Sequence, residues 1–173
     1  MLAQFTKEIL CSPLFNGITP AELNQLMVSL QPQIMYYQSG NYITIYGAEA
    51  NSMGIILAGE ARVLKEDPGG NQVILDQLYV SDTFGEVITF SGTTNWLASI
   101  QAQKPTTVCF LAPEKIIEYY DASGPGHRTL IHNLVRFLAR KALMLNQRIE
   151  YLSIKSIRGK ICMYLLDQYR KWG

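Results

Sequence analysis

The 173-residue sequence contains few of the residues on which metal and redox sites depend. Its three cysteines, Cys11, Cys109 and Cys162, are far apart and odd in number, which excludes a disulfide framework and a Cys-x-x-Cys metal or redox motif. The two histidines, His127 and His132, are five residues apart and do not share a helix face as a metal-binding pair would. We therefore expect no metal site and no cofactor.

The sequence also lacks the signatures of common enzymes and of membrane proteins. No Gly-x-Ser-x-Gly elbow, Gly-x-x-x-x-Gly-Lys phosphate loop or Gly-x-Gly-x-x-Gly fingerprint occurs. No apolar run approaches the ~20 residues of a membrane helix, and the N-terminus lacks the basic start and apolar stretch of a signal peptide. These absences favour a cytoplasmic, non-enzymatic protein without a membrane partner.

The formal net charge of +1 conceals two oppositely charged regions. Residues 1–125 carry five basic and twelve acidic side chains, whereas residues 126–173 carry ten basic and two acidic ones. The net charges of the two regions are therefore −7 and +8. Such a division suggests regions with different roles, the basic one facing an anionic partner, although solvated helix faces alone would also explain it.

The chain changes near residue 33 from a helical to a β-rich pattern. Before this point, Thr19-Pro20-Ala21-Glu22 fits a helix-capping box with proline at the first helical position. After it, short β-rich runs alternate with turn residues, which predicts an antiparallel sandwich or roll. A short helix is expected to interrupt the β region at Thr83–Phe90. The seven expected strands are Ile34–Tyr37, Tyr42–Tyr46, Gly54–Leu57, Ala61–Lys65, Gln72–Leu78, Ala98–Gln103 and Thr106–Leu111.

The last third of the sequence is predicted to be helical. A short helix from Pro113 to about Tyr120 precedes a break at residues 123–126. Longer helices are expected over Arg128–Ser153 and from Ile157 to about Arg170.

Apolar residues in the first of these long helices are spaced 4-3-4-3-4-3, which is the seam of a two-helix coiled coil. A second apolar flank, with Leu130, Leu134, Phe137 and Tyr151, would pack on the β region. We therefore expect a homodimer, and the alternative is a helix buried on both sides within one chain. The expected interface residues are Ile131, Val135, Leu138, Ala142, Leu145, Ile149 and Leu152.

Several glycine-containing motifs follow one another in a characteristic order. They are Gly40-x-x-Ile43-x-x-x-Gly47, the run from Met53 to Ala61, Asp82-x-Phe84-Gly85-Glu86 and, after the long helix, Ile157-Arg158-Gly159-Lys160-Ile161. With these motifs, residues 10–170 resemble bacterial transcription regulators of the cyclic-AMP receptor protein/fumarate–nitrate regulator (Crp/Fnr) family. The resemblance implies an α+β fold, in which an antiparallel β-roll (a double-stranded β-helix like a cyclic-nucleotide-binding domain) is joined to N-terminal helices and a long C-terminal dimerisation helix.

The resemblance also implies three parts. Residues 1–125 would form the effector-sensing β-roll, residues 126–153 the coiled-coil helix, and residues 154–173 the first helix of a truncated winged helix-turn-helix domain. Proteins of the family continue for roughly fifty residues more, and these contain the recognition helix that enters the DNA major groove. DNA, and with it RNA polymerase, would be contacted through that missing part. The alternative is a stand-alone small-molecule-binding module that does not bind DNA.

Two departures from the family pattern concern the ligand. Cyclic-nucleotide binders of the family carry an Arg-Ser pair about eleven residues after the motif glycine, and this position holds Trp96-Leu97 here. No arginine lies between Arg62 and Arg128, and an indole cannot replace a guanidinium that binds phosphate. The Thr-Ser pair that reaches the base in such proteins falls on Leu145-Asn146. Cyclic AMP and cyclic GMP are therefore not expected as ligands. A third departure is Ser81, which replaces a family glycine and is expected to be tolerated.

The remaining predicted pocket has an apolar mouth with Glu86 and Asn146 as polar groups. Glu86 would open the inserted helix, where backbone N–H groups favour an anion, although a simple first-turn acid explains it equally well. Two interpretations stay open: the pocket takes an unknown small-molecule effector, an uncharged or cationic aromatic metabolite, or Trp96 and Leu97 plug it and the domain binds no ligand. The predicted pocket residues are Gly85, Glu86, Trp96, Leu97, Ala98, Leu145 and Asn146.

Overall fold

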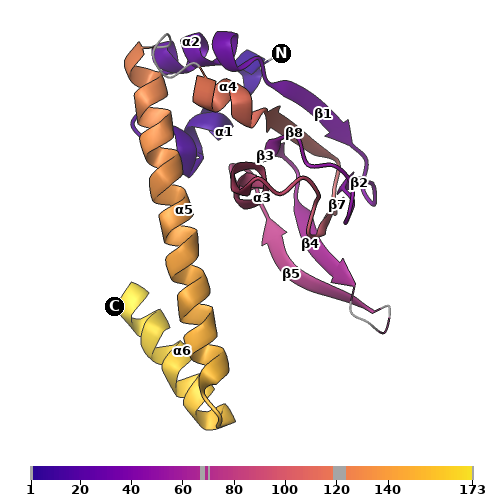
Figure 1. The fold of residues 1–173 in the computed structure, drawn as a ribbon, viewed down its shortest axis with the longest axis vertical. Coiled ribbons are helices and arrows are strands. Elements are labelled where there is room, and N and C mark those ends of the chain that lie inside the picture. The colour runs from indigo at the N-terminus through magenta and orange to yellow at the C-terminus, as the bar shows by residue number, and fades with distance from the viewer. Residues whose placement is uncertain (1, 67–68, 70, 119–123, 173) are drawn as a thin grey trace. The chain divides into compact units, whose positions relative to one another are not determined.

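The computed structural model describes residues 2–66, 69, 71–118 and 124–172. The chain forms two compact units, Met1–Leu134 and Val135–Gly173. The first unit holds the N-terminal helices, all the described strands and the first turns of the long helix α5 (Figure 1). The second unit holds the remainder of α5 and the last helix, α6.

The N-terminal segment is helical, as predicted, and comprises η1 (Leu2–Phe5), α1 (Thr6–Cys11), η2 (Pro13–Phe15) and α2 (Pro20–Leu30). The predicted capping box begins α2: the Glu22 backbone N donates to Thr19 Oγ1 over 3.3 Å, and the Thr19 backbone N donates to Glu22 Oε2 over 2.8 Å. The Thr19 backbone N–H, and then its hydroxyl, hold the pKa of the Glu22 carboxyl below its ordinary value because they stabilise the carboxylate.

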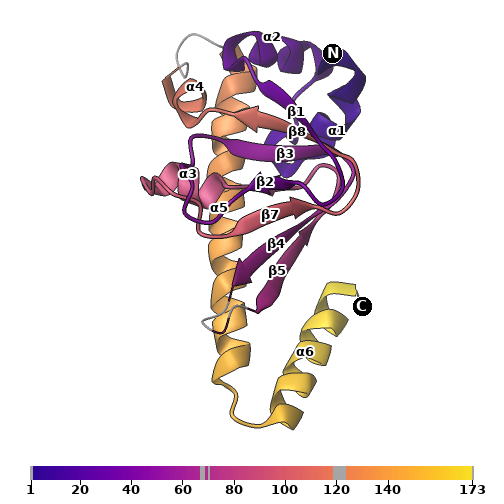
Figure 2. The same cartoon turned by 90° about the vertical axis from the view of Figure 1, so that its right-hand side faces the viewer.

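Two four-stranded antiparallel sheets form the β-roll, which confirms the predicted fold class. The first sheet has the strand order β1-β8-β3-β6 and the second β2-β7-β4-β5, whose strands lie side by side in Figure 2. The strands are β1 (Gln33–Tyr37), β2 (Tyr42–Thr44), β3 (Met53–Ala58), β4 (Ala61–Glu66), β5 (Gln72–Leu78), β6 (Thr83–Phe84), β7 (Ser99–Ala102) and β8 (Thr106–Leu111).

Strand β6 is the element that the sequence pattern does not reveal. Its two residues fall in the segment expected to be helical, yet they pair with Gly54 and Ile55 of β3. The pairing depends on Gly54, because a Cβ atom there would lie 2.1 Å from the Phe84 ring. The expected inserted helix is present as α3 (Glu86–Ser91), and Glu86 opens it as predicted. Strand β2 ends at Thr44, two residues before the predicted end.

The core contains residues from both sheets. Its buried members include Ile43 and Ile100 from the second sheet and Ile56 and Val108 from the first. Strand β3 is buried along almost its whole length, which accounts for its unbroken apolar sequence. Cys109 in β8 is fully buried, and burial raises the pKa of its thiol to about 12, so this cysteine is not a reactive thiolate.

The C-terminal helices are α4 (Pro113–Glu118), α5 (Gly124–Ser153) and α6 (Ile157–Trp172). The remainder of the expected Pro113–Tyr120 helix, residues 119 and 120, lies outside the described residues. Ser156 caps the N-terminus of α6, since its Oγ accepts a hydrogen bond from Gly159 N over 3.0 Å. In the part of the chain that the structure describes, no helix combines the length and apolar character that crossing a membrane requires.

The predicted chain break at residues 123–126 is wrong for residues 124–126, which form the start of α5. A proline is compatible with the first turn of a helix because its missing N–H would have no intrahelical partner there. Gly126 allows α5 to approach α2 closely: a Cβ atom at this position would lie 2.9 Å from Glu22 Cβ. Ser123 lies outside the described residues. The boundary between the two compact units falls within α5, so the predicted three-part division stays a prediction.

Candidate ligand site of the β-roll

The Asp82–Glu86 motif forms the turn that leads from β6 into α3. Gly85 has a φ of +81°, a left-handed conformation that favours glycine, and it precedes the first residue of α3. Its carbonyl oxygen accepts hydrogen bonds from the backbone N and Oγ1 of Thr89, at 2.9 and 2.6 Å. Glu86, the first residue of the helix, is buried. The motif therefore forms a tight corner with a buried acidic residue.

The indole of Trp96 fills the space beside Gly85. A Cβ atom on Gly85 would lie only 2.5 Å from Trp96 Cη2. The side chain is 6% exposed, belongs to the core and lies with its ring centroid 6.2 Å from that of Phe84. Trp96 thus occupies the approach to the motif glycine with an apolar ring.

The backbone of Trp96 is held as firmly as its ring. Its N–H donates to Ala48 O and its carbonyl accepts from Gly47 N, both over 2.8 Å. The neighbouring Asn95 Nδ2 donates to Gly47 O over 2.7 Å. Because its backbone is hydrogen-bonded and its ring is buried, Trp96 belongs to the packed structure of this corner and is not a surface side chain.

Arg62, the one arginine before Arg128, lies on the other face of the second sheet. Its Nη2 and Nε donate to Gln101 Oε1 over 2.9 and 3.3 Å. Arg62 is paired with Gln101, whereas the adjacent pair, Ala61 and Ala102, is buried in the core. Since successive strand residues point to opposite faces, the guanidinium faces away from the core and from Trp96.

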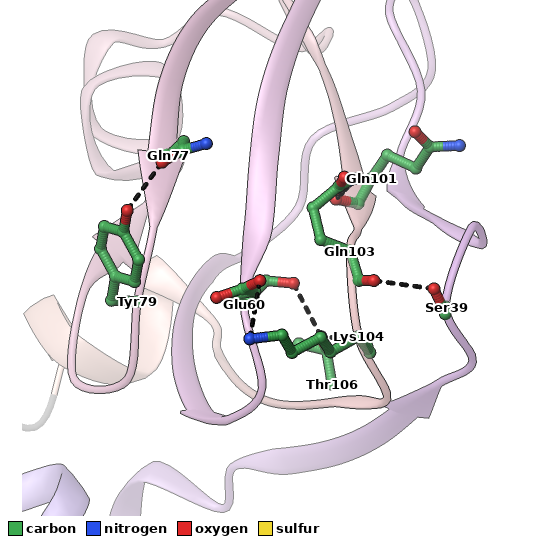
Figure 3. A network of polar contacts seen from close by, with 8 residues as sticks. All are labelled: Ser39, Glu60, Gln77, Tyr79, Gln101, Gln103, Lys104 and Thr106. Atoms are coloured by element: carbon green, nitrogen blue, oxygen red, sulfur yellow. Dashed lines mark hydrogen bonds and ion pairs between the residues drawn. The ribbon is translucent and has the colours of Figure 1, made fainter.

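Gln101 and Gln103 belong to a network of polar contacts (Figure 3). Gln103 Nε2 donates to Gln101 O over 3.5 Å, and Ser39 Oγ donates to Gln103 O over 2.7 Å. Lys104 Nζ and Glu60 Oε1 form an ion pair at 3.0 Å. The ion pair joins the β3–β4 turn to the β7–β8 turn. Through its hydrogen bonds to Gln101, Arg62 is part of the same network.

Among the predicted pocket residues, the first unit brings Gly85 and Trp96 together. Leu97 is 56% exposed and Ala98 is half-buried on the segment that leads into β7. Leu145 and Asn146 lie in the second unit, so the assembly of the complete seven-residue pocket stays a prediction.

The predicted dimer seam lies along α5 and is largely uncovered in the single chain. Four of its apolar residues are 55–73% exposed, namely Val135, Leu145, Ile149 and Leu152. Ala142 is also exposed, whereas Ile131 and Leu138 are half-buried. On the second apolar flank, Leu130 and Leu134 are buried, and Phe137 and Tyr151 are half-buried.

Sequence reasoning missed the role of Ser81. This residue has a φ of +74°, which is strained for a residue with a side chain. Its Oγ donates to Glu8 O over 2.7 Å, and its backbone N donates to Ile56 O over 2.8 Å. Ser81 therefore joins α1 to the turn that precedes β6, a link that a glycine would not form.

Sequence reasoning also missed a pocket of about 330 Å³ on the second sheet, partly lined by Tyr42 and Tyr46. These tyrosines occupy unspecified positions of the Gly40–Gly47 motif, so the motif does not single them out, and only the three-dimensional structure brings them together with Leu64 and Ser99. Among the described residues, no group of three or more histidine, cysteine or acidic side chains is placed to hold a metal ion.

Comparison with known proteins agrees with this architecture. Residues 34–123 match the family described as the cyclic nucleotide-binding domain. The chain is 26% identical over 161 residues to the cyclic AMP receptor protein of Thermus thermophilus, covering 92% of this chain and 71% of that protein.

Two solved structures have the same fold. The Thermus thermophilus catabolite activator protein gives a TM-score of 0.71 at 25% identity, covering 82% of this chain and 63% of that one. The sensor domain of the transcriptional regulator DNR from Pseudomonas aeruginosa gives a TM-score of 0.67 at 21% identity, covering 91% of this chain and 99% of that one. The match of the family over more than half of the chain, together with the β-roll and its glycine corner, shows that the chain belongs to the cyclic nucleotide-binding domain family, with relatives among the CRP-like transcription regulators.

Proposed function

We propose that this chain is the effector-sensing and dimerising part of a cytoplasmic, Crp/Fnr-type DNA-binding transcription regulator that does not respond to cyclic nucleotides. DNA and RNA polymerase would be contacted through the helix-turn-helix part of the full-length regulator. Similarity to a CRP-like cAMP-activated global transcriptional regulator of Mycobacterium tuberculosis, 22% identical over 160 residues, supports the general role. The observation that carries the finer proposal is the buried indole of Trp96 against Gly85.

A cyclic phosphate carries a negative charge that must be neutralised and hydrogen-bonded where it leaves water. The Gly85 corner offers an apolar ring at the position where the family has a guanidinium, and Arg62 is bound to Gln101 on the opposite face of the sheet. To admit a phosphate, Trp96 would have to leave the core, which forfeits roughly 1.5–3 kcal/mol of apolar burial. The lack of a cation for the phosphate and the loss of Trp96 burial both oppose the binding of a cyclic nucleotide.

Isothermal titration calorimetry with cyclic AMP and cyclic GMP tests this part of the proposal. We expect no saturable binding of either nucleotide to this chain. The cyclic AMP receptor protein of Thermus thermophilus, titrated in the same buffer, is the positive control suggested by its name. Micromolar binding of either nucleotide to this chain would overturn the proposal.

The exposed apolar seam of α5 supports the dimer. An isolated helix face with this 3-4 repeat is stabilised when a second helix covers it by knobs-into-holes packing. The double variant Leu138→Arg/Leu145→Arg should therefore sediment as a monomer, because it brings charge into the seam. The matched control, Leu143→Arg/Met144→Arg, places the same two charges at exposed apolar residues outside the seam and should remain dimeric. A seam variant that still sediments as a dimer would disprove this interface.

A further inference from the structure

The pocket on the second sheet lies on the face opposite the core. Tyr42 is paired with Gln101, and Leu64 is paired with Ser99. Because paired residues share a face and alternate residues along a strand do so too, these side chains lie on the face that also carries Arg62. The core-facing neighbours on the same strands are Ile43, Val63 and Ile100.

The lining of this outer-face pocket combines a closed apolar floor with aromatic walls. Leu64 forms the floor and is only 3% exposed, although it lies on the outer face of the sheet. Tyr42, Ile45 and Tyr46 surround it and remain 41–63% exposed. The volume of about 330 Å³ is in the range of pockets that hold small molecules.

The polar groups of the pocket are few and carry no net charge. Gln72 Nε2 donates to Tyr42 Oη over 3.4 Å, and Ser99 Oγ accepts from Tyr46 N over 3.0 Å, so the Ser99 hydroxyl hydrogen can be directed toward a ligand. Lys65 and Glu66, which are adjacent at the rim, contribute one positive and one negative charge. A multiply charged anion would gain little here, whereas a flat ring with a few hydrogen-bonding groups matches both the walls and the rim.

We propose that the outer-face pocket binds a small planar aromatic molecule without net charge, such as a neutral heteroaromatic or a zwitterionic aromatic amino acid. The ring lies over Leu64 between Tyr42 and Tyr46, where stacking on the phenol rings adds to apolar burial. In a zwitterion, the carboxylate faces Lys65 and the ammonium faces Glu66. This site does not rest on the proposed function, because it lies on the opposite face of the sheet from Trp96 and needs no second chain.

Amide chemical shifts of the ¹⁵N-labelled 173-residue chain, followed during titration, test the site. The probes are indole, L-tryptophan, tryptamine and indole-3-acetate, which share one ring system and differ in charge. We expect saturable shifts centred on Tyr46, Leu64 and Ser99 with indole and L-tryptophan. Tryptamine and indole-3-acetate, which each carry one charge, should bind with at least tenfold lower affinity. Equal binding of all four probes would disprove the charge selection, and the absence of saturable shifts in the pocket would disprove the site.

Two tyrosine variants distinguish binding in this pocket from nonspecific binding to exposed aromatic side chains. Tyr46→Ala removes an exposed wall and should weaken L-tryptophan binding at least tenfold, while the shifts of residues outside the pocket still report a folded chain. Tyr36→Ala removes a tyrosine of similar exposure from β1, outside the pocket, and should bind L-tryptophan normally. Equal loss in both variants, or shifts centred on Trp96 instead, would overturn the proposal.

Discussion

Gly85 and Gly47 have almost the same backbone conformation but different surroundings. Their φ angles are +81° and +80°. A Cβ atom at Gly47 would meet nothing within 4 Å, whereas one at Gly85 would collide with the Trp96 ring. Gly47 is therefore required for its backbone alone, and Gly85 is required for its backbone and for the space that the indole occupies.

This contrast predicts different costs for the same substitution. Gly47→Ala should lower the free energy of unfolding by about 1–2 kcal/mol, the usual cost of a left-handed residue with a side chain. Gly85→Ala should lose a further ~1–3 kcal/mol because the methyl group overpacks the site. Urea unfolding of both variants measures the difference. Equal losses would mean that Trp96 does not pack on Gly85.

The sequence reveals the chemistry of this corner only in part. The absence of an arginine between Arg62 and Arg128 can be read directly from the sequence. The burial of Trp96 cannot, because it depends on contacts with Gly47, Ala48 and Gly85, which are distant in the sequence. The sequence leaves open whether Trp96 lines a ligand-binding mouth or fills the site, and in the structure its indole is buried against Gly85.

At the scale of elements, local signals predict best where local interactions decide the structure. The capping box at Thr19 and Glu22 is predictable because each partner lies within one helical turn of the other. Strand β6 is not, because its two residues pair with Gly54 and Ile55, which lie 30 and 28 positions earlier in the chain. The start of α5 is also missed, because glycine and proline usually end helices, whereas here they form the first turn.

The capping box of α2 also predicts a pH dependence. The pKa of Glu22 is lowered in the folded chain, so its stabilising contribution is fully present above the unfolded pKa near 4.5 and disappears as the pH falls through the lower folded value. Glu22→Gln should therefore reduce the free energy of unfolding at neutral pH and approach the wild type in acid. Urea unfolding across this pH range measures the gap.

In a Thr19→Ala background, the pH-dependent effect of Glu22→Gln should be smaller but not absent. The Thr19 hydroxyl is then removed, whereas the backbone N–H, which has the larger influence on the Glu22 pKa, remains. A gap between wild type and Glu22→Gln that does not change with pH would contradict the role of this carboxylate.

At the scale of the whole molecule, the uneven charge distribution predicts weak binding of nucleic acid that does not depend on sequence. The excess of +8 over residues 126–173 should attract DNA phosphates at low ionic strength and lose affinity as salt rises. Fluorescence anisotropy with two unrelated short duplexes measures both properties. We expect equal affinities for the two sequences.

Charge reversal of exposed arginines on α5 tests the source of this attraction. Arg136→Glu/Arg140→Glu should weaken binding to both duplexes and reduce the slope of log affinity against log salt by about 1 for each phosphate that the variant no longer neutralises. Lys7→Glu, an exposed cation of the first unit, should leave both unchanged. Equal effects of the two variants would show that the attraction is not confined to residues 126–173.

The hydrogen bond between Ser81 and Glu8 has a consequence for the design of shortened proteins. Ser81 keeps an unfavourable backbone angle while its hydroxyl is bound to the carbonyl of Glu8. A version of the protein that begins after α1 would retain the strained serine and lose its compensating partner. In such a shortened protein, we expect Ser81→Gly to be stabilising, because glycine adopts this backbone angle without strain and no longer gives up the hydrogen bond to Glu8.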